Sequence, residues 1–128
     1  YVNHYQPGEA EDERAKINYA ELTLNGFQLV AMDHGAGGTE AFNEAFSLMV
    51  LCKNQAEIDY YWEKLSAVPE AEQCGWLKDK FGVSWQIVPE QLGRMLETAT
   101  EEEAKRITQS FLGMKKLDIA ALEQARLG

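Results

Sequence analysis

The sequence predicts an α+β domain built from two related βαβββ modules and followed by a helical tail. A short internal repeat is the first observation behind this fold class, because Phe27-Gln28-Leu29-Val30 and Trp85-Gln86-Ile87-Val88 share one pattern of aromatic, Gln, aliphatic and Val. Each copy forms the second strand of a predicted β-hairpin, which is the second observation. The third is an amphipathic helix predicted between the two hairpins, as a duplicated βαβββ module requires.

Length and composition limit the classes of protein to consider. With 128 residues, 45% of them hydrophobic and 26% charged, the chain is expected to fold as one globular domain. Its 12 basic and 21 acidic residues give a net charge of -9, which disfavours binding to nucleic acid or to an anionic membrane. The sequence shows neither a long apolar run nor an export signal, so we expect a cytoplasmic protein. Cys52 and Cys74 lack metal or redox spacing and are expected to be small buried apolar residues.

The first predicted elements are a short opening strand, an acidic loop at residues 9–13 and a β-hairpin. Residues 16–24 and 27–33 alternate as strands do, and the Asn25-Gly26 dipeptide between them favours a type I′ turn. One face of the hairpin is then apolar and is predicted to be core: Ala20, Leu22, Leu24, Phe27, Leu29 and Ala31. The other face is a polar and adaptable mixture, which is either wet surface or the lining of a pocket: Tyr19, Glu21, Thr23, Gln28, Val30 and Met32.

The second module begins after a glycine-rich loop at residues 35–39. Residues 45–52 are predicted as a buried strand, and a helix is predicted from Asn54, which has the capping-box spacing to Glu57. Residues 73–78 and 83–88 are predicted as a second hairpin, in which Gly82 takes a left-handed turn conformation. Apolar residues at helical spacing form the stripe expected to pack on the sheet: Ile58, Tyr61, Trp62 and Leu65.

The tail is predicted to form two or three short amphipathic helices. Pro89 suits the first position of a helix, Thr100 and Glu103 have the spacing of a capping box, and Asp118 can cap a last helix. The apolar residues of these helices need a partner surface, either the sheet of this domain or a second subunit: Leu92, Leu96, Ile107, Phe111, Leu122 and Ala125.

Three stretches carry a resemblance to a known family. They are the block Gln73-Cys-Gly-Trp-Leu-Lys-Asp-Lys-Phe-Gly-Val-Ser-Trp-Gln-Ile-Val-Pro89, the helix motif Asp59-Tyr-Tyr-Trp-Glu-Lys-Leu65 and the tail segment Met114-Lys-Lys-Leu-Asp-Ile-Ala-Ala-Leu122. Together they resemble the PhnB-like family, also labelled demethylubiquinone methyltransferase-like. This family belongs to the vicinal oxygen chelate superfamily of glyoxalases, bleomycin-resistance proteins and extradiol dioxygenases.

The resemblance implies a glyoxalase-like fold of two βαβββ modules whose curled sheets surround a cleft, commonly completed in a homodimer. It places the glyoxalase-like domain at residues 1–92 and a C-terminal helical extension at residues 93–128. The first strand and helix of module one would precede Tyr1. We therefore expect either that the natural chain starts earlier or that a partner completes the domain, and the former is favoured because a missing helix would expose apolar surface.

The resemblance also indicates where a metal or ligand would bind. Enzymes of the superfamily hold a divalent metal with four side chains; Gln28 and Gln86 match two of these positions, and Ala45 takes the place of a third. Two neutral amides hold zinc, iron or nickel poorly, so no cofactor is expected, and a divalent metal on Gln28, Gln86 and Glu21 is the alternative. We expect a small molecule to bind in the cleft between the modules, against Tyr19, Glu21, Gln28, Met32, Trp76 and Gln86.

The chemistry of the site is left open by the sequence. His4 and His34 are expected to be surface residues, so no catalytic group can be named. A module that sequesters a small molecule, as bleomycin-resistance proteins do, is at least as well supported as a metal-dependent glyoxalase or dioxygenase. The run Leu29-Val-Ala-Met-Asp-His-Gly-Ala-Gly-Gly-Thr39 resembles the strand and glycine loop of S-adenosylmethionine-dependent methyltransferases, but its strand belongs to an antiparallel hairpin where those enzymes have a parallel strand.

Overall fold

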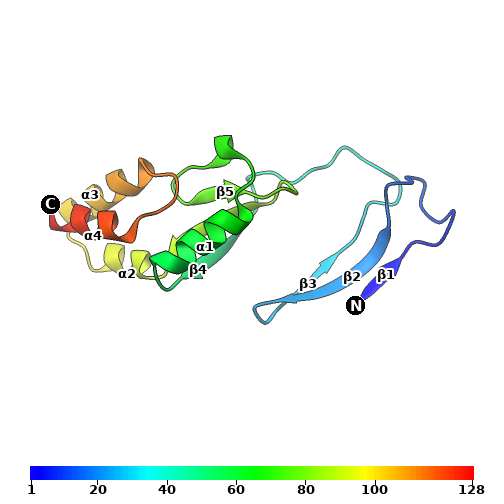
Figure 1. Cartoon of the computed structure of the whole chain (residues 1–128), viewed down its shortest axis with the longest axis horizontal. Helices are drawn as coiled ribbons and strands as arrows, with labels where there is room; N and C mark the ends of the chain where they lie inside the picture. The colour runs from blue at the N-terminus through cyan, green and yellow to red at the C-terminus, as the bar shows by residue number, and fades with distance from the viewer. The chain divides into compact units, whose positions relative to one another are not determined.

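The computed structural model describes all 128 residues and divides them into two compact units, Tyr1–Glu40 and Ala41–Gly128. The first unit contains strands alone, whereas the second contains strands and helices (Figure 1). No helix in either unit combines the length and the apolar character that crossing a membrane needs. The α+β class predicted from the sequence is confirmed, with two small sheets and a helical C-terminus.

The first unit is an antiparallel sheet of three strands in the order β1-β2-β3. Strand β1 covers Val2–His4, β2 covers Ile17–Leu24 and β3 covers Phe27–Ala31. The turn predicted at Asn25-Gly26 is confirmed, because the two residues have positive φ angles of 49° and 79°. The predicted register is confirmed as well, since β2 and β3 pair Leu24 with Phe27 and Leu22 with Leu29.

The apolar face of this hairpin is not the core that the sequence predicted. Leu22 and Leu24 are 44% and 43% exposed, and Phe27 is 74% exposed. The prediction is wrong because residues 1–40 include no helix that could cover a face of the sheet. As a result, Ala15 is the one buried apolar residue of this unit.

The second unit contains a mixed sheet with a helix packed on one face (Figure 1). Strand β4, Ser47–Cys52, runs parallel to β6, Ser84–Pro89. Strand β5, Trp76–Lys78, is antiparallel to β6, so the order is β4-β6-β5. Helix α1, Gln55–Leu65, lies in the crossover between the parallel strands, as such a connection requires. The core between helix and sheet consists of Cys52, Ile58, Leu77 and Ile87, with Tyr61, Trp62 and Leu65 packed around it.

Helix α1 begins at the predicted cap, with one difference. Asn54 Oδ1 accepts a hydrogen bond from Glu57 N at 2.9 Å, as an N-cap side chain does. The carboxylate of Glu57 does not return to Asn54 but accepts from Lys53 N at 2.8 Å, one residue earlier. After the helix, a single 3-10 turn, η1 at Pro69–Ala71, leads toward β5.

Two predicted boundaries in the second unit are wrong. The strand predicted from residue 73 begins at Trp76, because Cys74 and Gly75 form a tight turn with φ angles of 38° and 88°. Gln73 and Trp76 exchange backbone hydrogen bonds across this turn. Pro89, predicted to start a helix, is the last residue of β6, a strand-end position that its missing N–H allows.

The hairpin of β5 and β6 is otherwise as predicted. Trp76 pairs with Gln86 and Lys78 pairs with Ser84. Gly82, in the connecting turn, has a φ of 86°. Strands β3 and β6 are thus each the second strand of a hairpin, although β3 is an edge strand of its sheet and β6 is the central strand of its own.

Three helices form the tail, namely α2 at Gln91–Glu97, α3 at Glu101–Leu112 and α4 at Ile119–Leu127. Their apolar residues pack mainly on one another, and Val88 of β6 packs against the same cluster. The partner surface that the sequence left open is therefore supplied within this chain. The buried members of the tail core are Leu92, Met95, Ile107, Leu117 and Leu122.

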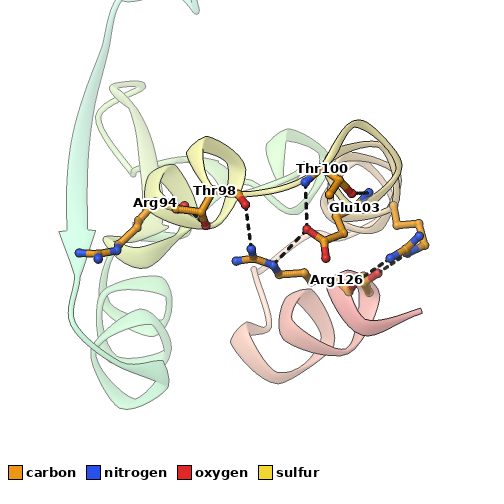
Figure 2. Close-up of polar contacts among 7 residues, drawn as sticks. Arg94, Thr98, Thr100, Glu103 and Arg126 are labelled. Atoms are coloured by element: carbon orange, nitrogen blue, oxygen red, sulfur yellow. Dashed lines mark hydrogen bonds and ion pairs between the residues drawn. The ribbon is translucent and has the colours of Figure 1, made fainter.

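Polar contacts tie the tail helices together (Figure 2). The predicted capping box is confirmed, because Thr100 Oγ1 accepts from Glu103 N and Glu103 Oε2 accepts from Thr100 N at 2.9 Å. Arg126 of α4 donates to Thr98 O at 3.1 Å, and its Nε lies 3.6 Å from Glu103 Oε2. The predicted cap of α4 is confirmed too, since Asp118 Oδ1 accepts from Ala121 N.

Candidate functional site

Four of the residues predicted to bind a ligand belong to the polar face of the first unit. Tyr19 and Glu21 are two residues apart on β2, and Gln28 of β3 pairs with Thr23 in register. Tyr19 Oη donates to Glu21 Oε1 at 2.7 Å, and this hydrogen bond raises the pKa of Tyr19. Met32 follows the end of β3 and is 64% exposed. The structure thus presents a phenol, a carboxylate and an amide on one sheet face.

The other two predicted residues, Trp76 and Gln86, lie side by side in the second unit. They are direct partners in the antiparallel pairing of β5 and β6. Gln86 alternates with Ile87, which is buried under helix α1, so Trp76 and Gln86 belong to the opposite face of the sheet. Gln86 Nε2 donates to Ser47 Oγ at 2.9 Å, which orients the amide across to β4.

A cavity of about 470 Å³ opens beside these strands. Trp76 lines the cavity, whereas Gln86 is not among the lining residues and lies next to it through their pairing. Trp76 is the one tryptophan of three in the lining; Trp62 and Trp85 direct their indole N–H groups to Glu72 and Asp79. The lining residues are Glu44, Ala71, Gln73, Cys74, Trp76, Leu77, Lys78 and Ser84.

An ion pair stands at the cavity wall. Lys78 Nζ lies 2.5 Å from Glu44 Oε1, and the hydrogen bond from Lys78 lowers the pKa of Glu44. The Glu44 side chain is 65% exposed and that of Lys78 is 24% exposed, so the lysine is the more enclosed partner. A ligand anion could compete with Glu44 for the ammonium group, since Glu44 is free to move into solvent.

The two thiols of the chain differ in their surroundings. Cys74 is partly buried in the cavity wall, and Cys52 is fully buried in the core beneath helix α1. Burial raises the pKa of the Cys52 thiol to about 11, so this side chain stays protonated at neutral pH. The sequence prediction of a buried apolar role is confirmed for Cys52 and is only partly correct for Cys74, because the turn at Cys74-Gly75 brings it to the wall.

Sequence reasoning missed most of the lining residues. Lys78 and Ser84 could have been found, because each lies two residues from Trp76 or Gln86 on its strand, so all four side chains share one face of the sheet. Gln73 and Cys74 reach the wall through the turn at Cys74-Gly75. Cys is not a typical turn residue, so the sequence contains no strong signal for this turn. Glu44 lies in a loop, and nothing in the sequence connects it to Lys78.

The glycine-rich loop belongs to a smaller hollow in the first unit. This hollow has a volume of about 220 Å³ and is lined by Asp12, Arg14, Ala15, Asp33, His34, Gly37 and Gly38. Its charged groups already have partners, since Arg14 pairs with Asp12 and the carboxylate of Asp33 accepts two backbone N–H groups. The loop follows an antiparallel strand, and no helix begins before residue 55.

The residues predicted as weak metal ligands fit a divalent metal poorly. Gln28 and Gln86 offer neutral amide oxygens, and the carboxylate of Glu21 already accepts a hydrogen bond from Tyr19. The structure contains no group of three or more His, Cys, Asp or Glu side chains placed to share an ion. Zinc, iron and nickel sites in proteins depend on such imidazole, thiolate or carboxylate ligands.

Comparisons with known proteins agree with this architecture. Residues 1–88 match the family model described as 3-demethylubiquinone-9 3-methyltransferase. The chain is also similar to the solved structure of the PhnB protein from Bacillus cereus, which carries the same family description. The two chains are 30% identical, the match covers 70% of this chain and 76% of that one, and the TM-score is 0.57. No curated protein matches the chain.

Proposed function

We propose a function from one premise, which is that this chain belongs to the 3-demethylubiquinone-9 3-methyltransferase family and has the glyoxalase-like fold of PhnB. In this proposal the protein binds a small planar molecule in the cavity beside Trp76. In the same proposal, the protein belongs to the vicinal oxygen chelate superfamily. It binds its ligand without using a metal held by four side chains. The observation that carries the proposal is the cavity itself, which places an aromatic wall next to a small number of polar groups.

The contacts at the cavity support a ligand of this class. An indole face favours flat, apolar ligand surface, and Ser84, Lys78 and Gln86 supply polar groups on the same side of the sheet. Because Lys78 is the enclosed member of its ion pair, a carboxylate or enolate on the ligand can replace Glu44 as its partner. The face of β2 and β3 that carries Tyr19, Glu21, Gln28 and Met32 stays a predicted ligand surface.

Calorimetric titration with 2-naphthoate tests this proposal, with 2-naphthol as the neutral analogue. We expect Trp76→Ala to weaken the binding of both probes about fivefold or more, because the aromatic contact is lost. Lys78→Met should weaken naphthoate more than naphthol. Tyr60→Ala is the matched control, since Tyr60 is an aromatic residue on the outer side of α1 that is 56% exposed. Equal affinities in wild type and Trp76→Ala would reject the cavity as the binding site.

Two rival functions have their own tests. The family description suggests a methyltransferase, so the same calorimetry is run with S-adenosylmethionine. Micromolar binding of that cofactor would favour the methyltransferase. Elemental analysis of the purified protein addresses a metal-dependent glyoxalase or dioxygenase, and near-stoichiometric zinc, iron or nickel would favour it.

We also propose that the protein is a cytoplasmic homodimer. The apolar face of Leu22, Leu24 and Phe27 supports the dimer, because soluble proteins rarely leave a contiguous apolar patch uncovered. Two free cysteines without a disulfide are typical of proteins from a reducing compartment. Sedimentation velocity should show a dimer that Leu24→Lys dissociates, whereas Thr23→Lys, on the opposite face of the same strand, should leave it intact. A wild-type monomer at high concentration would rule out the dimer.

A further inference from the structure

We propose that the loop between helices α3 and α4 positions the wall of the cavity. The wall includes Gln73 and Cys74, and these two residues belong to the tight turn that ends at Trp76. The family model matches residues 1–88 and stops before the tail, yet the tail supplies the contacts that hold this turn. The inference rests on the proposed function only where it treats the cavity as a binding site.

Three hydrogen bonds join the turn to the last residue of α3 and to the loop that follows it. Gln73 Nε2 donates to Leu112 O at 2.8 Å, Cys74 N donates to Met114 O at 2.6 Å, and Gly75 N donates to Lys115 O at 2.8 Å. Three consecutive residues of the turn therefore bond to the C-terminal end of α3 and to the first half of the loop. Since Cys74 is a non-glycine residue at a φ of 38°, its conformation needs such outside support to persist.

The turn packs closely against the core at Gly75, where a side chain would have little room. A Cβ added to Gly75 would lie 3.2 Å from Ile87 O and 3.2 Å from Leu117 Cδ1. Leu117 is 1% exposed and belongs to the tail core. Any displacement of Leu117 consequently changes the space available to the turn, and with it the cavity wall.

The other end of the loop is fastened to helix α1. Gln55 Nε2 donates to Leu117 O at 3.0 Å, and Gln55 Oε1 accepts from Ile119 N at 2.9 Å. Lys116 Nζ lies 2.8 Å from Asp59 Oδ1 on the same helix. Gln55 is thus a positioning residue that acts on the cavity through Leu117, although it is not among the cavity lining.

Contacts between α3 and α4 fix the two helices that flank the loop. Arg106 of α3 donates to Ala125 O at 3.0 Å and to Arg126 O at 2.7 Å, at the C-terminal end of α4. Arg126 in turn donates to Thr98 O (Figure 2). The two helices are thus bound to each other at the C-terminal end of α4 and through their shared core. The two ends of the loop are therefore held at a constant separation.

Alkylation of the two cysteines by iodoacetamide, resolved by peptide mass spectrometry, tests the proposal without any ligand. We expect Gln55→Ala to raise the rate at Cys74 about tenfold, because two hydrogen bonds that hold the loop are lost. The alkylation rate at Cys52 should not change, because this fully buried thiol reacts only when the core beneath α1 opens. Gln109→Ala, an exposed glutamine on α3, is the matched control and should change neither rate.

Three outcomes would overturn the proposal. They are an unchanged rate at Cys74, a parallel rise at both cysteines in Gln55→Ala, or a similar rise in Gln109→Ala. If Gln55→Ala does not fold, Lys116→Met is measured instead, with about a twofold rise at Cys74 expected from loss of a half-exposed ion pair. An unchanged Cys74 rate in that variant would likewise reject the coupling.

A second measurement separates this proposal from the proposed function. Titration of Gln55→Ala with 2-naphthoate should show weaker binding than wild type, while Gln109→Ala should bind normally. If wild type itself fails to bind the probe, the proposed function fails, and the alkylation rates still decide whether the loop positions the wall. If wild type binds and Gln55→Ala binds equally well, the positioning role is rejected and the proposed function stands.

Discussion

At the scale of single residues, one carboxylate organises the start of the second strand. Asp33 Oδ2 accepts from Lys16 N and from Ile17 N, both at 2.8 Å. These backbone bonds favour the ionised form and lower the pKa of Asp33 from its ordinary value of 3.8. Asp33 thereby joins the end of the β2–β3 hairpin to its beginning, where Asp33 N also donates to Ile17 O.

The lowered pKa of Asp33 predicts a pH dependence for the first unit. A carboxylate with a depressed folded-state pKa contributes stability above its unfolded pKa and loses it as the pH falls through the folded value. We therefore expect the amides of β2 and β3 to lose protection below about pH 4. Asp33→Asn should lower stability at pH 7 and flatten this pH dependence, whereas Glu13→Gln in the exposed loop should do neither. The check is hydrogen exchange between pH 3 and pH 7, and an unchanged profile in Asp33→Asn would contradict it.

At the scale of elements, two tight turns show how far turn chemistry can be read from a sequence. Asn25-Gly26 and Cys74-Gly75 both have two consecutive positive φ angles. The first was predicted because Asn and Gly tolerate that conformation at little cost. The second was missed because Cys has no such preference, and contacts with the α3–α4 loop hold it in place.

Two glycines make a matched pair for testing this backbone effect. A Cβ added at Gly26 or at Gly93 meets no atom within 4 Å, so only backbone conformation differs between them. Gly26 has a φ of 79°, and Gly26→Ala should destabilise the first unit by about 1 kcal/mol. Gly93 lies within helix α2, and Gly93→Ala should stabilise the second unit by about 0.5–1 kcal/mol. Urea unfolding followed by NMR resonances of each unit measures both, and effects of equal sign would refute the explanation.

At the scale of the whole molecule, the buried core is distributed unequally. Apart from Ala15, every fully buried apolar residue belongs to the second unit, in the clusters around Ile58 and Ile107. Burial of apolar surface is the main stabilising term in folding, so the two units should differ in stability. The boundary predicted at residue 92 falls within helix α2, and it stays a prediction beside the division of the structure at residue 40.

This distribution predicts unequal protection of backbone amides. In dilute protein, the exchange rates of the amides of β4, β6 and α3 should be lower than those of β2 and β3 by about tenfold or more. Hydrogen exchange read by mass spectrometry makes the comparison. If the proposed homodimer covers the apolar face of β2 and β3, their protection should rise with protein concentration while that of α3 stays constant. Equal protection of the two units at all concentrations would contradict the prediction.

Much of the secondary structure could be predicted from the sequence because its causes are local. The Asn25-Gly26 turn, the caps at Asn54, Thr100 and Asp118, and the pairing of Leu22 with Leu29 each depend on residues a few positions apart. A period of two fixes which side chains share a strand face, so Trp76 could be grouped with Gln86 before any contact was known.

Only the tertiary structure decided which of those faces are covered and what closes the cavity. The sequence marked Leu24 and Phe27 as apolar and predicted no helix in residues 1–40, but only the structure shows that these side chains lie exposed. The ion pair of Glu44 with Lys78 and the attachment of Gly75 to Lys115 O join residues more than thirty positions apart. Local propensity depends on neighbours in the chain. Contacts such as these depend on how separate elements pack against one another, and the pattern of a single segment does not specify that packing.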